Sequence, residues 1–317
     1  MLLKRLFKEL LAVVIRYCGV ALFIRELYAG KKVSVLLYHD PSPEIVDKHL
    51  AYLVRRYTFI TLDALVNAIY SKDWSSVPER SLVITLDDGF KRNFELLEIF
   101  RKYRVVPTLY ICSQVVNTNR RFWFKTPGID SDALAEQLSN RERVEFLRDR
   151  HDFENIKEYS DEERMALNLD EIAVMKDFVD LQSHTRFHPV LSTCLDDECG
   201  EEIRQSKEEV EKMTGKECQH FSYPNGVYTE REVELVRRAG YKSARTTDVG
   251  WNTMNTDPYK LKITGTSDDA SISMLVAHMS GVIPYLRHLS KGSLNGKCPT
   301  IQPKGCDPVT AVLSRQD

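Results

Sequence analysis

The 317-residue sequence has no excess of basic residues, and this absence bounds the class of partner it binds. It contains 44 lysines and arginines against 46 aspartates and glutamates, and its formal net charge is −2. A protein that binds nucleic acid over a broad surface needs positive charge to neutralise phosphates. The composition therefore argues against a nucleic-acid-binding protein, although a local basic patch is compatible with it.

Cysteine is also scarce. The seven cysteines are odd in number and scattered along the chain, a pattern that fits reduced thiols in a cytoplasm better than a disulfide framework. Cys194 with Cys199, or Cys298 with Cys306, could pair in an oxidising setting, but the spacing does not require it. We therefore expect a cytoplasmic protein.

Long apolar runs are missing as well, even in the apolar N-terminal segment, residues 1–27. Arg16 interrupts this segment, and its longest uncharged stretch, 17–24, is far shorter than the roughly 20 residues that span a bilayer. No small-residue cleavage site of a secretory signal follows. The segment therefore predicts neither a membrane-spanning helix nor a signal peptide.

The same N-terminal segment has the spacing of an amphipathic helix, which we assign to residues 1–30. Lys4, Lys8 and Arg16 gather on one side, and the opposite stripe contains Leu3, Leu6, Phe7, Leu10, Val13, Val14, Tyr17, Ala21 and Ile24. Two roles remain open for this helix. It lies in the plane of a membrane, as a peripheral contact on the inner face, or it packs on the domain that follows.

Residues 31–290 alternate strand-like and helix-like segments and predict one α/β domain. Repeated βα units imply a parallel sheet, open or closed into a barrel, with ligands at the carboxyl ends of its strands. Residues 113–177 form a mostly helical excursion between two strands, which either covers the site or is a solvated decoration. Residues 291–317, rich in Gly, Pro, Lys and Asn, predict a weakly structured tail.

The most informative stretch is LVITLDDGF, residues 82–90. Its apolar, β-branched run is typical of a strand buried on both faces, and it stops at Asp87 and Asp88. Gly89 allows the backbone to approach other groups closely. Two adjacent carboxylates at the edge of a sheet can divide the chemistry, since one can bind a cation while the other moves a proton.

Three histidines also follow apolar runs directly, so the fold should bring them to the same edge. They are His39 and the pair His184 and His188, whose spacing of four residues is one helical turn if the segment winds. Two histidines and one carboxylate leave an open position on a divalent metal. That pattern is catalytic, since closed structural zinc sites favour four ligands.

The segments TLDDGF, SHTRFHP and FSYPNG, in this order, resemble the signature motifs of the polysaccharide deacetylases (carbohydrate esterase family four, NodB-homology domain). The resemblance implies a distorted (β/α) barrel and a metal-dependent hydrolase that removes acetyl groups from N-acetylated sugars. It implies Asp87 as the general base. It also implies one divalent ion, expected to be zinc, held by Asp88, His184 and His188.

The resemblance extends to substrate contacts and to a general acid. It implies that Tyr223, Pro224 and Asn225 of the third motif contact the substrate, and Trp251, in a loosely similar fourth motif, is a further candidate that core packing would equally explain. Two histidines are candidates for the acid that protonates the departing amine. One is His278, in an amphipathic helix expected over 271–289, and the other is His39 at the end of its strand.

The chain departs from the family pattern at Ser222, where many members carry an arginine that orients the base. Asp87 must therefore be oriented in another way. We expect a deacetylase that acts on an amino sugar in a polysaccharide or lipid-linked glycan, with the N-terminal helix holding it near a membrane. The alternatives are a degenerate member that binds a glycan without hydrolysing it, and a metal-dependent hydrolase of a non-sugar amide.

Overall fold

The computed structural model describes residues 2–19, 21, 23, 25–26, 31–265 and 267–281, with side chains from residue 6 onward. The expected tail, residues 291–317, and the second half of the last expected helix lie outside the described residues.

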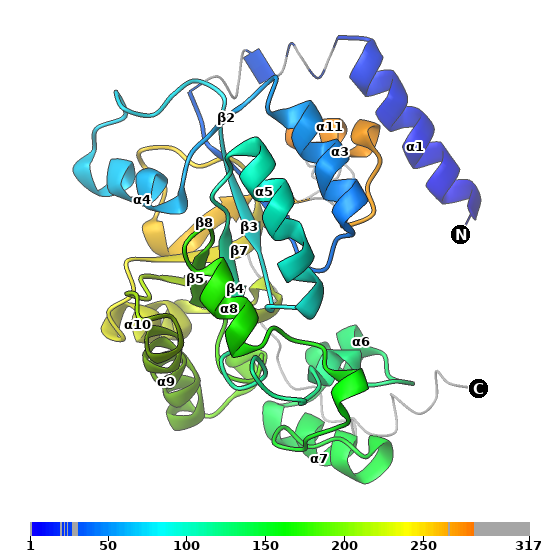
Figure 1. Ribbon diagram of the computed structural model, residues 1–317, viewed down its shortest axis with the longest axis vertical. Coiled ribbons are helices and arrows are strands. Elements are labelled where there is room, and N and C mark those ends of the chain that lie inside the picture. The colour runs from blue at the N-terminus through cyan, green and yellow to red at the C-terminus, as the bar shows by residue number, and fades with distance from the viewer. Residues whose placement is uncertain are drawn as a thin grey trace.

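The described strands form one parallel sheet that curves into a nearly closed barrel (Figure 1). Its path runs in the order β1-β3-β4-β5-β6-β7-β8, and β2 pairs with the start of β3. Beyond β8, the amide of Thr264 donates to the carbonyl of Val35 at 2.8 Å, so the last strand lies beside the first. The predicted distorted barrel is confirmed. The strands are β1 (Ser34–Tyr38), β2 (Thr58–Phe59), β3 (Ser81–Leu86), β4 (Thr108–Ile111), β5 (Asp180–Ser183), β6 (His220–Ser222), β7 (Ser243–Val249) and β8 (Leu261–Ile263).

Burial on both faces explains the uninterrupted apolar runs of the central strands. Every residue of β1 and β3 is buried. One set of side chains fills an inner cluster that includes Val35, Val83 and Tyr110, and the alternate set, including Leu36 and Ile84, packs outward against the surrounding helices. The short strands β2, β6 and β8 are not evident as apolar runs, because two or three residues are too few to show a period.

Helices surround the barrel, and the predicted excursion supplies three of them between β4 and β5 (Figure 1). Its helices α6 and α7 lie together at one end of the molecule (Figure 1). The helical segment after β3 begins as a 3₁₀ turn, Lys91–Leu96, which α5 continues. The described α-helices are α1 (Leu2–Tyr17), α3 (Pro43–Leu53), α4 (Leu62–Ser71), α5 (Leu97–Tyr103), α6 (Ser131–Gln137), α7 (Asn140–His151), α8 (Leu169–Met175), α9 (Asp196–Thr214), α10 (Glu230–Arg238) and α11 (Ile272–Met279).

The N-terminal helix α1 packs against α11 through the buried side chains of Ala12, Ile15 and Ala277. Its larger apolar side chains are exposed. None of the helices in the described ranges is long and apolar enough to cross a bilayer.

The five described cysteines are free thiols. Cys194 and Cys199 therefore do not form the disulfide that their spacing would allow, whereas Cys298 and Cys306 lie outside the described residues.

We predict that Gly89→Ala destabilises the fold more than Gly240→Ala. Both glycines have φ +81°, but a Cβ at position 89 would lie 2.9 Å from Cγ2 of Ile111, whereas position 240 faces open space. We expect a loss in the free energy of unfolding of roughly 2 to 5 kcal/mol at position 89 and about 1 to 2 kcal/mol at position 240, measured by urea denaturation. Equal losses would show that the close packing at Gly89 carries no cost.

Candidate metal and catalytic centre

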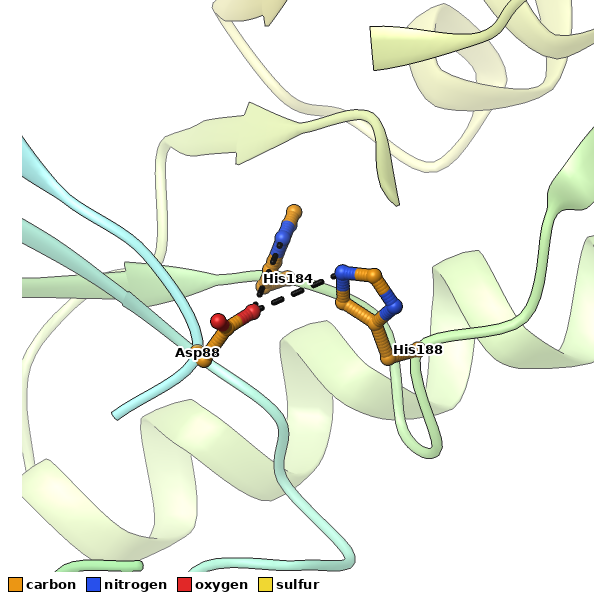
Figure 2. A group of neighbouring side chains, drawn as sticks. All are labelled: Asp88, His184 and His188. Atoms are coloured by element: carbon orange, nitrogen blue, oxygen red, sulfur yellow. Dashed lines mark ion pairs between the residues drawn. The ribbon is translucent and has the colours of Figure 1, made fainter. Parts of the chain in front are cut away.

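The structure brings together the three side chains expected to hold a metal ion (Figure 2). Oδ1 of Asp88 lies 3.5 Å from Nε2 of His184 and 3.4 Å from Nε2 of His188. All three side chains are buried, and one ligand atom from each lies within 4.8 Å of the others. They come from segments almost a hundred residues apart, the ends of β3 and β5, which the parallel sheet places at one edge.

Unusual backbone conformations aim these side chains. Asp88 has φ 74°, in the left-handed region that non-glycine residues rarely adopt. The histidine segment is a loop and not a helical turn, so the helical interpretation of its spacing is wrong. Thr185 and His188 have φ 66° and 59°, and the loop is held by Glu202 of α9. The Glu202 carboxylate accepts hydrogen bonds from the amides of residues 186 and 187 at 2.8 and 3.1 Å.

The protonation of the two histidines suits metal binding. Nδ1 of His184 donates to the carbonyl of Ser222 at 2.8 Å, which leaves the lone pair on Nε2 facing Asp88. Burial lowers the pKa of His184 to about 4 and the pKa of His188 well below its usual value. Both imidazoles are therefore neutral near pH 7, the form that binds metal ions.

Asp88 is the carboxyl group of the cluster and would supply its negative charge once a cation is bound. Burial, followed by the charge of Asp87, raises the pKa of Asp88 well above its usual value, and its Oδ1 is buried without a hydrogen-bond partner. A divalent cation among the three ligand atoms would offset both costs. The residues present therefore fit the metal ion that the motifs imply.

Asp87 lies beside this cluster and has its own cationic partner. Nη2 of Arg245, on β7, donates to Oδ2 of Asp87 and also to Oγ of Ser222. Burial alone would raise the pKa of Asp87, but the Arg245 guanidinium and, after it, His184 and His39 bring that pKa below its usual value. Asp87 is therefore a carboxylate near neutral pH, and its Oδ1 makes no hydrogen bond in the described structure. It can accept a proton.

A cavity of about 780 Å³ opens over these residues. The helical excursion forms one wall through Trp123, Phe124, Asp132 and Glu136. It also fixes His188, because the Phe124 ring lies 4.6 Å from the imidazole and Nε1 of Trp123 donates to the His188 carbonyl at 2.8 Å. Of the two roles left open for this segment, the structure places it over the site.

His39 lines this cavity and His278 does not. His278 lies instead on α11, in a separate cavity that includes Lys8 and Glu9 of α1. The helical segment that contains it is anchored by its apolar side chains Leu275 and Met279, which turn inward to the core. The structure therefore separates one of the two expected general acids from the metal cluster.

Of the expected substrate contacts, only Asn225 lines the cavity. Tyr223 belongs to the core, where its hydroxyl donates to the Tyr259 carbonyl at 3.2 Å, and Pro224 is buried. Trp251 packs toward Gly281, with the Lys32 ammonium 5.3 Å from its ring centroid. Tyr223 and Pro224 therefore do not make the direct contacts expected of them, because their side chains pack away from the cavity. Of the two roles left open for Trp251, the structure shows packing.

The sequence of this chain also matches a known protein family. The model of the family described as polysaccharide deacetylase matches residues 75–244, a little over half of the chain. The chain belongs to the polysaccharide deacetylase family. The match begins before β3 and ends within β7, so it contains both carboxylates, both histidines of the candidate metal site and Ser222.

Individual relatives are distant. Peptidoglycan-N-acetylmuramic acid deacetylase PdaA of Bacillus subtilis (strain 168) is 22% identical over 185 residues, which cover 57% of this chain and 52% of PdaA. The chain thus spans about half the length of that curated relative. The Streptococcus pyogenes deacetylase PplD, solved in complex with acetate, has 17% identity and a TM-score of 0.58 over 78% of this chain and 98% of PplD. IcaB from Ammonifex degensii has 16% identity and a TM-score of 0.57 over 79% of this chain and 98% of IcaB. At such identities the structural likeness shows a shared fold.

Sequence reasoning missed Arg245 as the partner of Asp87. The signal was available, since Ser222 lacks the arginine of the family pattern and an arginine occurs in the next strand-like segment. What could not be read was the register, in which Ser222 of β6 pairs with Arg245 of β7. The two positions are direct neighbours, so a guanidinium from either strand reaches the same space.

We predict that Arg245→Ala lowers kcat roughly 10- to 100-fold while the metal content stays unchanged, because the variant loses a charge-assisted hydrogen bond to the base and no metal ligand. Removing this cation raises the pKa of Asp87, so the acid limb of the pH–kcat/KM profile moves to higher pH. The measurements are acetate release against pH and elemental analysis.

Arg238→Ala, which removes an exposed arginine on α10, is the matched control and should leave the profile in place. The double variant Ser222→Arg with Arg245→Ser should recover part of the lost activity, since it returns a guanidinium to the neighbouring strand. An unshifted profile in Arg245→Ala would refute the assigned role.

Proposed function

We propose that this protein is a metal-dependent deacetylase that hydrolyses the N-acetyl group of an amino sugar in a polysaccharide or lipid-linked glycan. The observation that carries the proposal is the separation of two carboxylates at the floor of one cavity. Asp88 faces both histidines, whereas Asp87 is held by Arg245 with one oxygen unbonded. Amide hydrolysis needs both functions, an electrophilic ion and a proton acceptor.

Each residue has a distinct part in this reaction. Asp88, His184 and His188 would hold a divalent ion, which we propose is zinc. When bound, the ion would supply a Lewis acid that polarises the acetyl carbonyl and makes the attacking water more acidic. Asp87 takes the proton of that water at its carboxylate. Arg245 keeps Asp87 ionised and fixes its orientation.

Protonation of the departing amine is assigned to His39. Of the two histidines expected for this step, it is the one that lines the cavity. The tip of β1 is rigidly placed, because the amides of His39 and Asp40 donate to the Asp268 carboxylate at 3.0 and 2.8 Å. His39 can therefore deliver a proton from a fixed backbone position.

The substrate is proposed to be presented near a membrane. The N-terminal residues 1–27 provide the peripheral contact, on the cytoplasmic face, and the exposed apolar side chains of α1 support this placement. One relative, PdaA, is named for deacetylation of N-acetylmuramic acid in peptidoglycan, which supports an N-acetylated glycan as the substrate class.

We predict that Asp87→Asn retains the metal ion but loses at least 10²-fold in kcat, because the ligand set is intact and the proton acceptor is gone. His184→Ala should lose both metal and activity. The measurements are elemental analysis of the purified variants and acetate release from an N-acetylhexosamine oligomer.

Metal-loaded wild-type protein that bound the oligomer without releasing acetate would support the glycan-binding alternative. Acetate release, or ring opening, only from a panel of small non-sugar amides would support the third possibility. Loss of metal from Asp87→Asn would contradict the proposal that Asp88 is the metal ligand and Asp87 only the proton acceptor.

For the general acid, His39→Gln should lower kcat roughly 10²- to 10⁴-fold with the metal content unchanged. The matched control is His278→Gln, whose side chain lies in a different cavity and should leave kcat near the wild-type value. The reverse result, with activity lost only in His278→Gln, would show that α11 supplies the acid.

A further inference from the structure

Helix α1 presents its apolar side outward. Among the side chains of this helix that the structure describes, residues 6–17, only Ala12 and Ile15 are buried, both against α11. On an α-helical projection most of the exposed large side chains occupy the side away from these two residues, and Leu11 lies beside Ile15. The exposed large side chains are Leu6 (57% exposed), Phe7 (68%), Leu10 (64%), Leu11 (36%), Val13 (40%), Val14 (51%) and Tyr17 (73%). A helix that served only to cover the barrel would bury this stripe.

A cavity of about 240 Å³ lies beside the exposed stripe, between α1, α3 and α11. Three arginines line it, Arg16, Arg25 and Arg56, together with Tyr17, Tyr52 and Tyr57. Among the described residues Arg25 pairs with Glu26, whereas Arg16 and Arg56 form no ion pair. They stack instead on Tyr52, with the guanidinium carbons 5.4 and 3.8 Å from its ring centroid.

Such an arrangement suits an anionic group. Guanidinium ions bind phosphate oxygens through paired N–H donors, and the tyrosine rings hold the arginines in place without neutralising them. Tyr17 also belongs to the exposed stripe, so the cavity opens beside the apolar face of the same helix.

The distribution of charge along the chain also favours an anionic partner for the N-terminal segment. Residues 1–26 contain five basic and two acidic residues, a net charge of +3, whereas the whole chain carries −2. The remainder of the protein is therefore acidic and is repelled by an anionic membrane surface, while the N-terminal segment is attracted to it.

The contacts that hold α1 on the domain lie close to the catalytic cavity. Glu9 accepts a hydrogen bond from Ser271 at 2.7 Å, and Asp268, three residues earlier, holds the amide of His39 at 3.0 Å. His39 lines the catalytic cavity. A surface bound by α1 would therefore lie near the rim where the substrate enters.

We propose that α1 is an in-plane membrane anchor and that the cavity lined by Arg16, Arg25 and Arg56 takes the phosphate of an anionic phospholipid headgroup. The exposed stripe inserts among the acyl chains, and the guanidinium groups contact the phosphate at the level of the headgroups. The anchor is a membrane-binding site separate from the catalytic centre. Its use in presenting a lipid-linked glycan rests on the proposed function.

The test is co-sedimentation of the full chain with vesicles of phosphatidylcholine, with and without phosphatidylglycerol. We expect binding to vesicles that contain phosphatidylglycerol, weakened by salt. Arg16→Gln with Arg56→Gln should weaken this binding about 30-fold, at five- to sixfold for each arginine near the surface. Leu10→Glu with Val14→Glu should abolish this binding.

Two control pairs remove matching side chains elsewhere. Ile156→Glu with Val174→Glu removes exposed apolar residues (66% and 51% exposed), and Arg204→Gln with Arg238→Gln removes exposed arginines. Both pairs should bind vesicles like the wild type. Acetate release from a soluble N-acetylated oligosaccharide should be unchanged in all four double variants, the two test pairs and the two control pairs. Failure of the deacetylase proposal would therefore appear in this assay and not in the vesicle assay.

Three outcomes would overturn the proposal. The first is a wild-type protein that does not bind phosphatidylglycerol vesicles. The second is a wild-type dimer that Leu10→Glu with Val14→Glu converts to a monomer without any vesicle binding, since the stripe would then join two copies of this chain. The third is displacement from vesicles by millimolar inorganic phosphate, which would make the cavity a site for a free anion.

Discussion

Burial of two adjacent carboxylates is the constraint on which the rest of the site depends. Asp87 and Asp88 are both nearly inaccessible to solvent, and two negative charges at this separation cannot both stay ionised in a buried site without cations nearby. The protein meets the requirement in two ways. Arg245 neutralises Asp87 permanently, and the neutral imidazoles of His184 and His188 complete a ligand set around Asp88 in which a divalent ion would do the same.

This arrangement gives the two carboxylates different partners although they are neighbours in sequence. The left-handed backbone at Asp88 turns its side chain toward the histidines, while Asp87 turns toward β6 and β7. The arginine that serves Asp87 comes from β7, where the family pattern would place it on β6. Because these strands are paired in parallel with Ser222 beside Arg245, the change of strand preserves the position of the charge.

The two segments outside the barrel differ in what they contact. The excursion between β4 and β5 builds a wall of the cavity and holds His188 through Trp123 and Phe124. Helix α1 instead exposes its apolar side, next to arginines that have aromatic and not acidic partners. One addition therefore lines the cavity over the candidate metal cluster, and we infer that the other places the protein at a lipid surface.

The sequence by itself determined the strand that ends at Asp87 and Asp88, the βα repeats of the barrel and the pairing of His184 with His188 as potential ligands. Those features are local, since burial pattern and residue type suffice to read them. Only the tertiary structure decided the arginine that serves the base, the loop geometry of the histidines, the separation of His278 from the cavity and the packing of Tyr223 and Trp251. Each of these depends on strand register or on which face of an element meets the core. Both are set by contacts between segments that lie far apart in the sequence, so local residue patterns do not reveal them.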